Sequence, residues 1–276
     1  MTIRTYKPTT STLRSRKSLV REVDNVKPEK RLMLSNVGPS ARSRGRVSMR
    51  HQDSGARKMY RIIDYKRDKL NIPATVESIQ YDPNRGPNIA LLVYADGEKR
   101  YILAPEGLKK GIKVLSGGNI EATVGNAIPL KDIPLGMQIH NIELNPKAGA
   151  VLVRGAGAYA VLMAKEVGFV NLKMPSGEVK KVSGECYATI GALSNPDLRN
   201  VRLGKAGRNR HLGVRPAVRG VAMGNPSKGH PHGGSYKTTG IGMVMPKTPW
   251  GKPARGVRTR KRKSTDYSIV KGRHSK

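Results

Sequence analysis

The feature that most constrains this chain is the uneven placement of charge along its sequence. Basic residues outnumber acidic ones by 15 to 4 in residues 1–58 and by 20 to 2 in residues 197–276, but only by 17 to 13 in residues 59–196. The two ends are rich in Gly, Pro, Ser and Arg and show little apolar periodicity, so they cannot bury enough surface to fold alone. The sequence therefore predicts a folded middle carrying two basic extended arms.

The net charge of +33 at pH 7 points to a polyanionic partner. A single-signed excess of this size repels itself unless opposite charge is nearby, and solubility alone requires far less. We therefore expect a nucleic acid as the partner, and arms that become ordered against its phosphates. No membrane partner is expected, because no apolar run approaches the roughly 18 residues of a membrane span.

The single cysteine and the N-terminal residues bear on localisation. Cys186 lies in the apolar run 186–192, so neither a disulfide nor a cysteine-based zinc cluster can form within the chain. The first residues lack the apolar stretch of a secretory signal. They are basic and rich in Ser and Thr, which leaves an organelle transit peptide as the alternative, but they show no helical apolar face. We expect a cytoplasmic protein.

The middle of the chain has the pattern of β-structure, because short runs of Val, Ile and Tyr alternate with turns of Gly, Pro and Asp. Strands are expected over residues 59–65, 74–81, 89–95, 99–103, 111–115, 138–143, 150–154, 160–165, 169–174, 179–182 and 186–192, with a loop over 117–132. Asp96-Gly97 favours a two-residue type I′ hairpin turn. Pro175-Ser176-Gly177-Glu178 closes a second hairpin. Helical turns are expected only over residues 105–110 and, after an Asn195 cap, over 196–203.

These patterns predict an all-β fold of two consecutive small barrels, since small barrels remove exposed strand edges within a short length. The predicted domains are a basic N-terminal arm (1–58), a first barrel (59–125), a second barrel (126–196) and a basic Gly-rich C-terminal extension (197–276). Beyond residue 203 we expect no strand.

Basic residues interspersed with Gly in the two arms favour phosphate contact, since Gly permits close approach of the backbone. The alternative is a solvated tail or a localisation signal. The candidate RNA-binding residues in the arms are Arg44, Arg46, Arg50, Arg57, Lys58, Lys205, Arg208, Arg210, Arg219, Arg258, Arg260, Lys261, Arg262 and Lys263.

Two further arginines are candidates on the barrels. Arg85 lies in a turn between two predicted strands, and Arg154 ends a strand just before Gly155-Ala156-Gly157. Loop tips of small barrels commonly grip oligonucleotides, so both are expected to be exposed RNA contacts, and the alternative is an ordinary solvated arginine. The Gly-Ala-Gly string precedes a strand rather than a helix, so it is not a dinucleotide-binding loop.

His230 and His232, in a His-Pro-His-Gly-Gly string, raise the possibility of a metal or catalytic site. No Cys, Asp or Glu occurs between residues 198 and 265, so a ligand set and an orienting carboxylate are both missing locally. RNA contact is therefore the preferred interpretation, and His230 is kept only as a weak catalytic candidate. No nucleophile elbow, Walker loop or carboxylate pair is present, so no enzyme is expected. The acidic residues are expected on solvated faces of the barrels.

Several strings resemble the bacterial large-subunit ribosomal proteins of the L2 family. They are YRIIDYKR (60–67), YADGEKRYILAP (94–105), GNAIPL (125–130), MAKE (163–166), LKMPSGE (172–178), GKAGRNR (204–210), RGVAM (219–223) and HPHGG (230–234). The chain departs from the family pattern at two places. Before the His-Pro-His string, Gly224 is inserted, the spacer is Ser227-Lys228-Gly229 and no acid precedes His230. The string 52–58 also replaces a usual Gly-rich, His-containing one.

The resemblance implies an oligonucleotide-binding-type barrel, then an SH3-like barrel, with arms threaded into large-subunit rRNA beside the peptidyl-transferase region. It further implies neighbouring ribosomal proteins as partners and a role in joining the small subunit at the intersubunit face. It places Arg85 and Arg154 at rRNA contacts and His230 at a position suspected of helping peptide-bond formation. No cofactor is expected, and Mg²⁺ bound to rRNA phosphates is left open. The alternative functions are an RNA-acting enzyme with a basic tail and a free nucleic-acid compaction protein.

Overall fold

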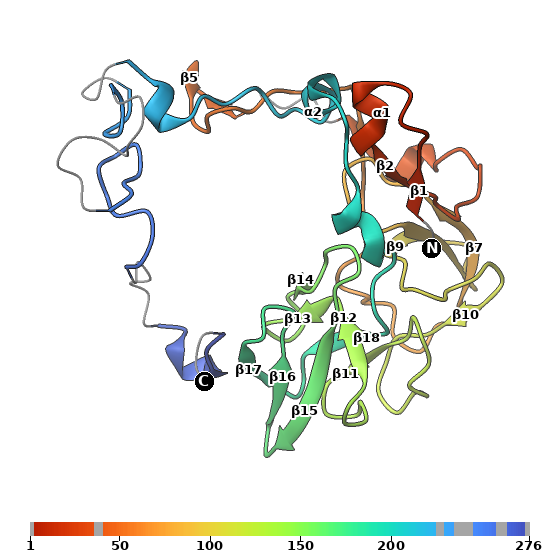
Figure 1. Ribbon diagram of the computed structural model, residues 1–276. Helices are drawn as coiled ribbons and strands as arrows, with labels where there is room; N and C mark the ends of the chain where they lie inside the picture. The colour runs from red at the N-terminus through yellow and green to blue at the C-terminus, as the bar shows by residue number, and fades with distance from the viewer. Residues whose placement is uncertain (1–2, 36–40, 225–228, 235–244, 258–263, 274–276) are drawn as a thin grey trace. The chain divides into compact units, whose positions relative to one another are not determined.

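The computed structural model describes residues 3–35, 41–224, 229–234, 245–257 and 264–273 (Figure 1). These residues form mostly short antiparallel strands, with two short α-helices, so the all-β fold class is confirmed. The chain divides into unit 1 (Met1–Val37, Arg57–Lys205 and Ser264–Lys276) and unit 2 (Gly38–Ala56 and Ala206–Lys263). No described helix is long and apolar enough to cross a membrane.

The first sheet of unit 1 has four antiparallel strands in the order β10-β7-β8-β9. Their bounds are β7 Ala74–Gln80, β8 Ile89–Tyr94, β9 Lys99–Leu103 and β10 Lys113–Val114. Strand β8 is buried on both faces, because its alternate residues point to opposite sides of the sheet. Ala90 and Leu92 pack in one apolar cluster, and Ile89 and Leu91 pack in another with Tyr101.

The turn between β8 and β9 differs from the predicted type I′ turn. Gly97 has a φ of 81°, but Asp96 is not among the described residues with positive φ, whereas a type I′ turn needs both. The Gly97 amide donates to the Tyr94 carbonyl at 2.9 Å, and the Tyr94 amide donates to the Glu98 carbonyl at 2.9 Å. The hairpin therefore has a three-residue loop with glycine at its left-handed position.

The second sheet of unit 1 has seven antiparallel strands in the order β11-β18-β12-β15-β16-β17-β19. Their bounds are β11 Ala127–Pro129, β12 Gln138–His140, β15 Ala160–Glu166, β16 Phe169–Lys173, β17 Val179–Ser183, β18 Tyr187–Ile190 and β19 Ile269–Lys271. Ile, Leu and Val side chains from these strands form one continuous core. The hairpin predicted at residues 175–178 joins β16 to β17, since the Gly177 amide donates to the Met174 carbonyl at 2.9 Å.

Two predictions about this second barrel are wrong. The expected loop 117–132 contains β11, and the expected strand 138–143 is broken into β12 and β13 (Ile142–Glu143). Asn141 causes the break, because its φ of 52° is left-handed, a conformation that asparagine adopts more readily than most residues. Strand β13 pairs instead with β14 (Ala150–Leu152) in a separate ribbon.

The N-terminal residues of unit 1 have more structure than predicted. They form β1 Ile3–Thr5, α1 Ser11–Ser15, β2 Lys17–Leu19, η1 Lys30–Leu32 and β3 Met33–Ser35. Strand β3 pairs with β6 (Met59–Arg61). Strand β6 covers only the first three residues of the strand expected over 59–65. The Asp24 amide also donates to the Ile79 carbonyl at 2.8 Å. This part of the arm therefore lies against the first barrel.

The C-terminal part of unit 1 also contains an unpredicted strand, because β19 pairs with β17 after the turn η4 (Asp266–Ser268). The turn expected after Asn195 is present as η2 (Pro196–Asn200). Asn195 does not cap it, however, since its side-chain amide donates to the Gly86 carbonyl at 2.9 Å and to Asn88 Oδ1 at 3.0 Å. Residues 105–110 form turns rather than a helix.

Unit 2 brings two distant stretches of chain together. It contains β4 (Arg42–Ser43), β5 (Arg46–Val47), the unpredicted helix α2 (Ala206–His211) and η3 (Gly220–Ala222). The Asp53 amide donates to the Gly213 carbonyl at 2.8 Å, and the Ala56 amide donates to the His211 carbonyl at 2.8 Å. Backbone hydrogen bonds thus hold the N-terminal stretch beside the C-terminal one.

Candidate nucleic-acid interface

Arg85 and Arg154 belong to different barrels, but both contact Tyr65. Arg85 Nε donates to the Tyr65 hydroxyl at 3.2 Å, and the guanidinium carbon of Arg154 lies 4.7 Å from the centre of the Tyr65 ring. The guanidinium of Arg85 also lies 4.7 Å from the centre of the Tyr60 ring. We call these four residues the Tyr65 cluster. The sequence pattern indicates no such meeting, since residues 85 and 154 are far apart in the chain.

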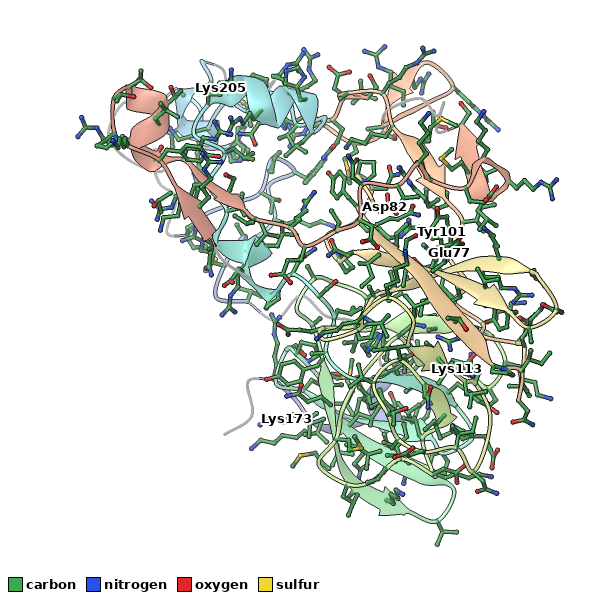
Figure 2. All side chains as sticks on the ribbon, turned by 90° about the vertical axis from the view of Figure 1, so that its right-hand side faces the viewer. Glu77, Asp82, Tyr101, Lys113, Lys173 and Lys205 are labelled. Carbon is green, nitrogen blue, oxygen red and sulfur yellow. The ribbon has the colours of Figure 1, made fainter. Side chains whose placement is uncertain are left out.

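Arg85 is not the exposed loop-tip residue that we predicted, because its side chain is only 12% exposed. Its Nη1 donates to the Arg61 carbonyl at 3.3 Å and forms an ion pair with Asp82, whose side chain is fully buried (labelled in Figure 2). Burial by itself would lower the pKa of Arg85, but the hydrogen bond with Tyr65 and the charge of Asp82 raise the pKa above its usual value. Arg85 therefore holds the β7–β8 loop together.

Asp82 and Glu143 also correct the expectation that acidic residues lie on solvated faces, since both are buried. Asp82 accepts from the Asn84 amide at 2.9 Å as well as pairing with Arg85. The Glu143 carboxylate accepts from the amides of Gly149 at 2.9 Å, Tyr187 at 3.0 Å and Lys147 at 3.3 Å. These carboxylates stabilise loops by satisfying donors inside the fold.

Arg154 is exposed and forms no ion pair in the described part of the chain. It lies two residues beyond β14, after Val153, which has a φ of 54°. A left-handed backbone is uncommon for a β-branched residue and costs on the order of 1–3 kcal/mol, so the surrounding structure must impose it. Packing of Val153 against the core and the 3.0 Å hydrogen bond from the Asn141 amide to its carbonyl do so. The strained turn at Val153 therefore sets the direction of the chain as it enters Arg154.

Close packing between loops explains why the two arginines meet. A Cβ added at Gly86, next to Arg85, would lie 2.9 Å from the Cβ of Ala156 and 2.8 Å from Leu198 Cδ2. The Gly155-Ala156-Gly157 string therefore serves to pack the second barrel's loop against the first barrel's. Asn88 in the same loop accepts the side-chain amide of Asn195, and the Asn88 amide donates to the Ser194 hydroxyl at 2.9 Å.

Arginine beside an aromatic ring recurs elsewhere in the structure. The guanidinium of Arg16 lies 4.2 Å from the ring centre of Tyr6, and that of Arg21 lies 3.8 Å from the ring centre of Tyr81. Such pairs keep a cation over an aromatic face. None of the tyrosines in these pairs, Tyr6, Tyr60, Tyr65 and Tyr81, was predicted as a site residue. The signal that could have indicated Tyr60 and Tyr65 is the presence of aromatic residues close to basic ones in the string 60–67.

Nearly all the charged residues of unit 2 are basic. By sequence it has 18 basic residues and a single acidic one, Asp53. Asp53 Oδ2 lies 3.2 Å from Arg210 Nη2 and 3.4 Å from Arg215 Nη1. The amide of Ser54 and these two cations hold the pKa of Asp53 below its usual value. By sequence, therefore, one carboxylate within the unit stands against 18 basic residues.

The arm candidates mostly lie on the surface. Arg44, Arg46, Arg50, Arg57, Lys205 (Figure 2), Arg210 and Arg219 are exposed, whereas Lys58 and Arg208 are half-buried. Arg44 has a φ of 48° in the turn between β4 and β5, and Arg50 lies 5.3 Å from the ring centre of the exposed Trp250. Arg258, Arg260, Lys261, Arg262 and Lys263 lie outside the described residues.

His230 and His232 stack on each other with ring centres 5.3 Å apart. His232 is buried, and its Nε2 accepts from the Lys247 amide at 2.6 Å, so its imidazole packs inside the loop, and RNA contact by this residue stays a prediction. The Nδ1 of the half-buried His230 accepts from the His232 amide at 3.2 Å. A Cβ at Gly220 would lie 2.5 Å from that same nitrogen, so Gly220 is required for this packing.

In the described part of the chain, no three His, Cys, Asp or Glu side chains gather as a metal site. Cys186 is a buried free thiol, and burial raises its pKa to about 11. A thiol with a raised pKa is a poor nucleophile at neutral pH.

Two family models match the chain. The model described as "Ribosomal Proteins L2, RNA binding N-terminal domain" matches residues 29–116, which include the first sheet and Arg85. The model described as "Ribosomal Proteins L2, C-terminal domain" matches residues 123–251, which include Arg154 and His230.

Proposed function

Because this chain belongs to the ribosomal protein L2 family, we propose that the Tyr65 cluster is the rRNA contact of its barrels. The family is a structural, RNA-binding part of the large ribosomal subunit and not an enzyme, and its two matched domains correspond to an oligonucleotide-binding-type barrel and an SH3-like barrel. The observation that carries the proposal is the convergence of Arg85 and Arg154 on Tyr65. An exposed guanidinium beside aromatic rings suits a phosphate with its neighbouring base.

The two arginines have different roles in this proposal. The Arg85 guanidinium donates to the Tyr65 hydroxyl, the Asp82 carboxylate and the Arg61 carbonyl. It is therefore a positioning residue that fixes the rings of Tyr60 and Tyr65. Arg154 is exposed and contacts the phosphate. Tyr60, whose surface is 38% accessible, offers a ring face to a base.

Unit 2 is proposed to neutralise phosphates without reading sequence. Its described cations lie on the short elements β4, β5 and α2 and on the segments that follow them, and glycines in these stretches allow the backbone to approach RNA closely. Within this unit, Arg50 and Trp250 form a further arginine–aromatic pair suited to a phosphate and its base.

The finer placement within the ribosome rests on the family resemblance. We propose that the C-terminal extension lies beside the peptidyl-transferase region and that the protein contacts the small subunit at the intersubunit face. His230 acts there by fixing its loop, because its Nδ1 and its ring are occupied by the His232 amide and by Gly220. Cytoplasmic placement of the ribosome stays a prediction.

The test is the affinity of the full chain for transcribed large-subunit rRNA after Arg154→Ala. Loss of one charge-assisted contact should weaken binding by about 1.5–3 kcal/mol, while the thermal unfolding midpoint stays unchanged because Arg154 is exposed. The matched control is Lys173→Ala, which removes an exposed cation from β16 (Figure 2). Equal losses in both variants would mean that Arg154 contributes only general charge and would contradict the proposal.

A further inference from the structure

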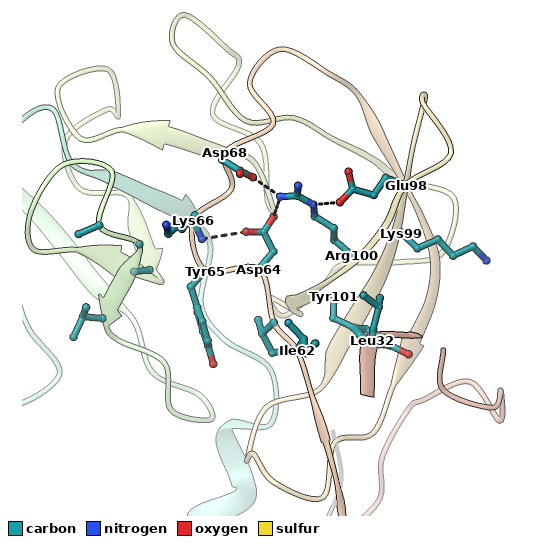
Figure 3. Close-up of a pocket in the computed structure, with 15 residues that line it drawn as sticks. Leu32, Ile62, Asp64, Tyr65, Lys66, Asp68, Glu98, Lys99, Arg100 and Tyr101 are labelled. Atoms are coloured by element: carbon teal, nitrogen blue, oxygen red, sulfur yellow. Dashed lines mark hydrogen bonds and ion pairs between the residues drawn. The ribbon is translucent and has the colours of Figure 1, made fainter. Parts of the chain in front are cut away.

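A cavity of about 570 Å³ lies in unit 1 beside the first sheet (Figure 3). Its walls come from β9, the segment following β6, and the β13–β14 ribbon. The buried residues Ile63 and Tyr101 line it, and so do Ile62 and Val151, which are 40% and 49% exposed. This volume is in the usual range for ligand pockets and suits one or two large apolar side chains. Exposed apolar residues beside a preformed hollow mark a binding surface.

The rim of this cavity carries three carboxylates, a local concentration of acidic residues that is unusual in so basic a chain. Figure 3 shows the Arg100 guanidinium between the carboxylates of Asp64, Asp68 and Glu98. Arg100 Nη1 lies 3.1 Å from Asp64 Oδ2 and also pairs with Asp68, and Arg100 Nε lies 2.7 Å from Glu98 Oε1. Hydrogen bonds from Arg100 hold the pKa of Asp68 and of Glu98 below their usual values, so both carboxylates are ionised at neutral pH.

The charge that remains at the rim is negative. Arg100 pairs with all three carboxylates, and Lys69 pairs with Glu98 and with the neighbouring Asp96. With the Lys99–Glu77 pair and Lys66 included, five acids lie with four cations, and the Asp68 and Glu98 side chains are 60% and 46% exposed. Lys99 points away from the cavity and pairs with Glu77 at 2.9 Å, which leaves Lys66 as the lining cation without a carboxylate partner in the described residues. Phosphate is therefore disfavoured here, in contrast to the face that carries Arg154. Tyr65, which belongs to both sites, lies at the boundary between them.

We propose that this cavity docks a segment of another protein that inserts an aliphatic or aromatic side chain flanked by Lys or Arg. The apolar walls receive the inserted side chain, and the exposed carboxylates of Asp68 and Glu98 pair with the flanking cations. Buried apolar anchors inside a charged rim are the usual source of affinity and specificity in such contacts. The partner differs in class from the RNA bound by the Tyr65 cluster, so either site can fail without the other.

The experiment places the photoreactive residue p-benzoylphenylalanine at position 151 of the full chain, assembled in the large ribosomal subunit. We expect an ultraviolet-dependent cross-link to protein, and mass spectrometry should find a large apolar residue within two positions of Lys or Arg in the captured peptide. The same photoreactive residue at position 62 covers a failure of the first variant to assemble. A cross-link to RNA, a captured peptide without this pattern, or no cross-link from either position would overturn the proposal.

Charge reversal at the rim tests whether negative charge on the cavity attracts cations of the partner. Asp68→Lys should lower the yield of the protein cross-link by about tenfold, because like charges would then oppose the flanking cations. The matched control is Glu106→Lys, an exposed acid outside the cavity, which should leave the yield unchanged. An unchanged or increased yield with Asp68→Lys would overturn the charge complementarity on which the proposal rests.

Discussion

Arg85 and Arg154 both contact Tyr65, but only Arg154 is exposed to a ligand. The Arg85 side chain instead neutralises Asp82, which is fully buried. The sequence could indicate that a turn lies at residue 85, because Asp82, Pro83, Asn84 and Gly86 are turn formers. It could not indicate burial of the arginine, which depends on the distant Tyr65 and on the loop around Ala156.

We expect Arg85→Ala to lower the free energy of unfolding by about 3–5 kcal/mol, because it leaves the buried Asp82 carboxylate without its close partner. The nearest remaining cation is Arg61, at 3.9 Å. Denaturant unfolding of the full chain measures the loss. Asp82→Asn in the same protein should recover part of it by removing the unpaired charge. A change within about 0.5 kcal/mol, as for ordinary surface substitutions, would contradict this role.

His140 predicts a pH dependence of stability. Burial lowers its pKa from 6.5 to about 4, and the charge of Arg67 acts in the same direction, while Nδ1 hydrogen-bonds the Gly191 carbonyl at 2.7 Å. Between pH 6.5 and about pH 4 the unfolded chain binds the proton more readily than the folded chain. The contribution of His140 to the free energy of unfolding is therefore fully present above the unfolded pKa, and it is lost as pH falls toward 4. The loss is about 1.4 kcal/mol per pH unit within that window.

Urea unfolding from pH 7 to pH 4.5 measures this dependence. In His140→Asn the part due to the imidazole should disappear, whereas the contribution of the carboxylates remains. The difference between the two proteins therefore isolates His140. Parallel stability curves for the two proteins would contradict the assignment.

Among the elements, strands with several alternating residues were predictable and very short ones were not. Residues 99–103 form β9 as predicted, and the predicted strand 74–81 is β7 (Ala74–Gln80). Strands β11 and β19 have three residues each, too few to show a period of two, and each exists because a partner strand, β18 or β17, offers free backbone groups. Their pairing is a tertiary effect.

Removal of residues 264–276 tests the role of β19. Without β19, β17 becomes an edge strand with unpaired amides, so hydrogen exchange in Val179–Ser183 should accelerate and the protein should self-associate more readily. The global unfolding free energy should change little, because Lys271 and Val270 are exposed. Removal of residues 274–276 alone is the control. Unchanged exchange in β17 after the longer deletion would show that β19 does not protect it.

Over the whole molecule, the distribution of acidic residues distinguishes two kinds of basic surface: one where lysines pair with glutamates and one where acids are nearly absent. In the barrels, Lys99, Lys131 and Lys181 pair with Glu77, Glu185 and Glu166, each at 2.9 Å. In unit 2 a single acid faces 18 basic residues. The sequence could predict this division, since it follows from counting charges along the chain. It could not predict that residues 38–56 and 206–263 combine into one unit, because that depends on backbone hydrogen bonds between distant residues.

This division predicts a specific salt dependence of rRNA binding. Each phosphate that a cation neutralises releases a counterion and contributes about 0.7–0.9 to the slope of log K against log salt. Replacing Arg44, Arg46 and Arg50 by Gln should therefore reduce the slope by about two to three units. Replacing Lys99, Lys131 and Lys181 by Gln removes the same formal charge, but these cations already pair with carboxylates, so the slope should hardly change. Filter binding of the full chain across a salt series measures both, and equal reductions in the two triple variants would show that net charge alone governs binding.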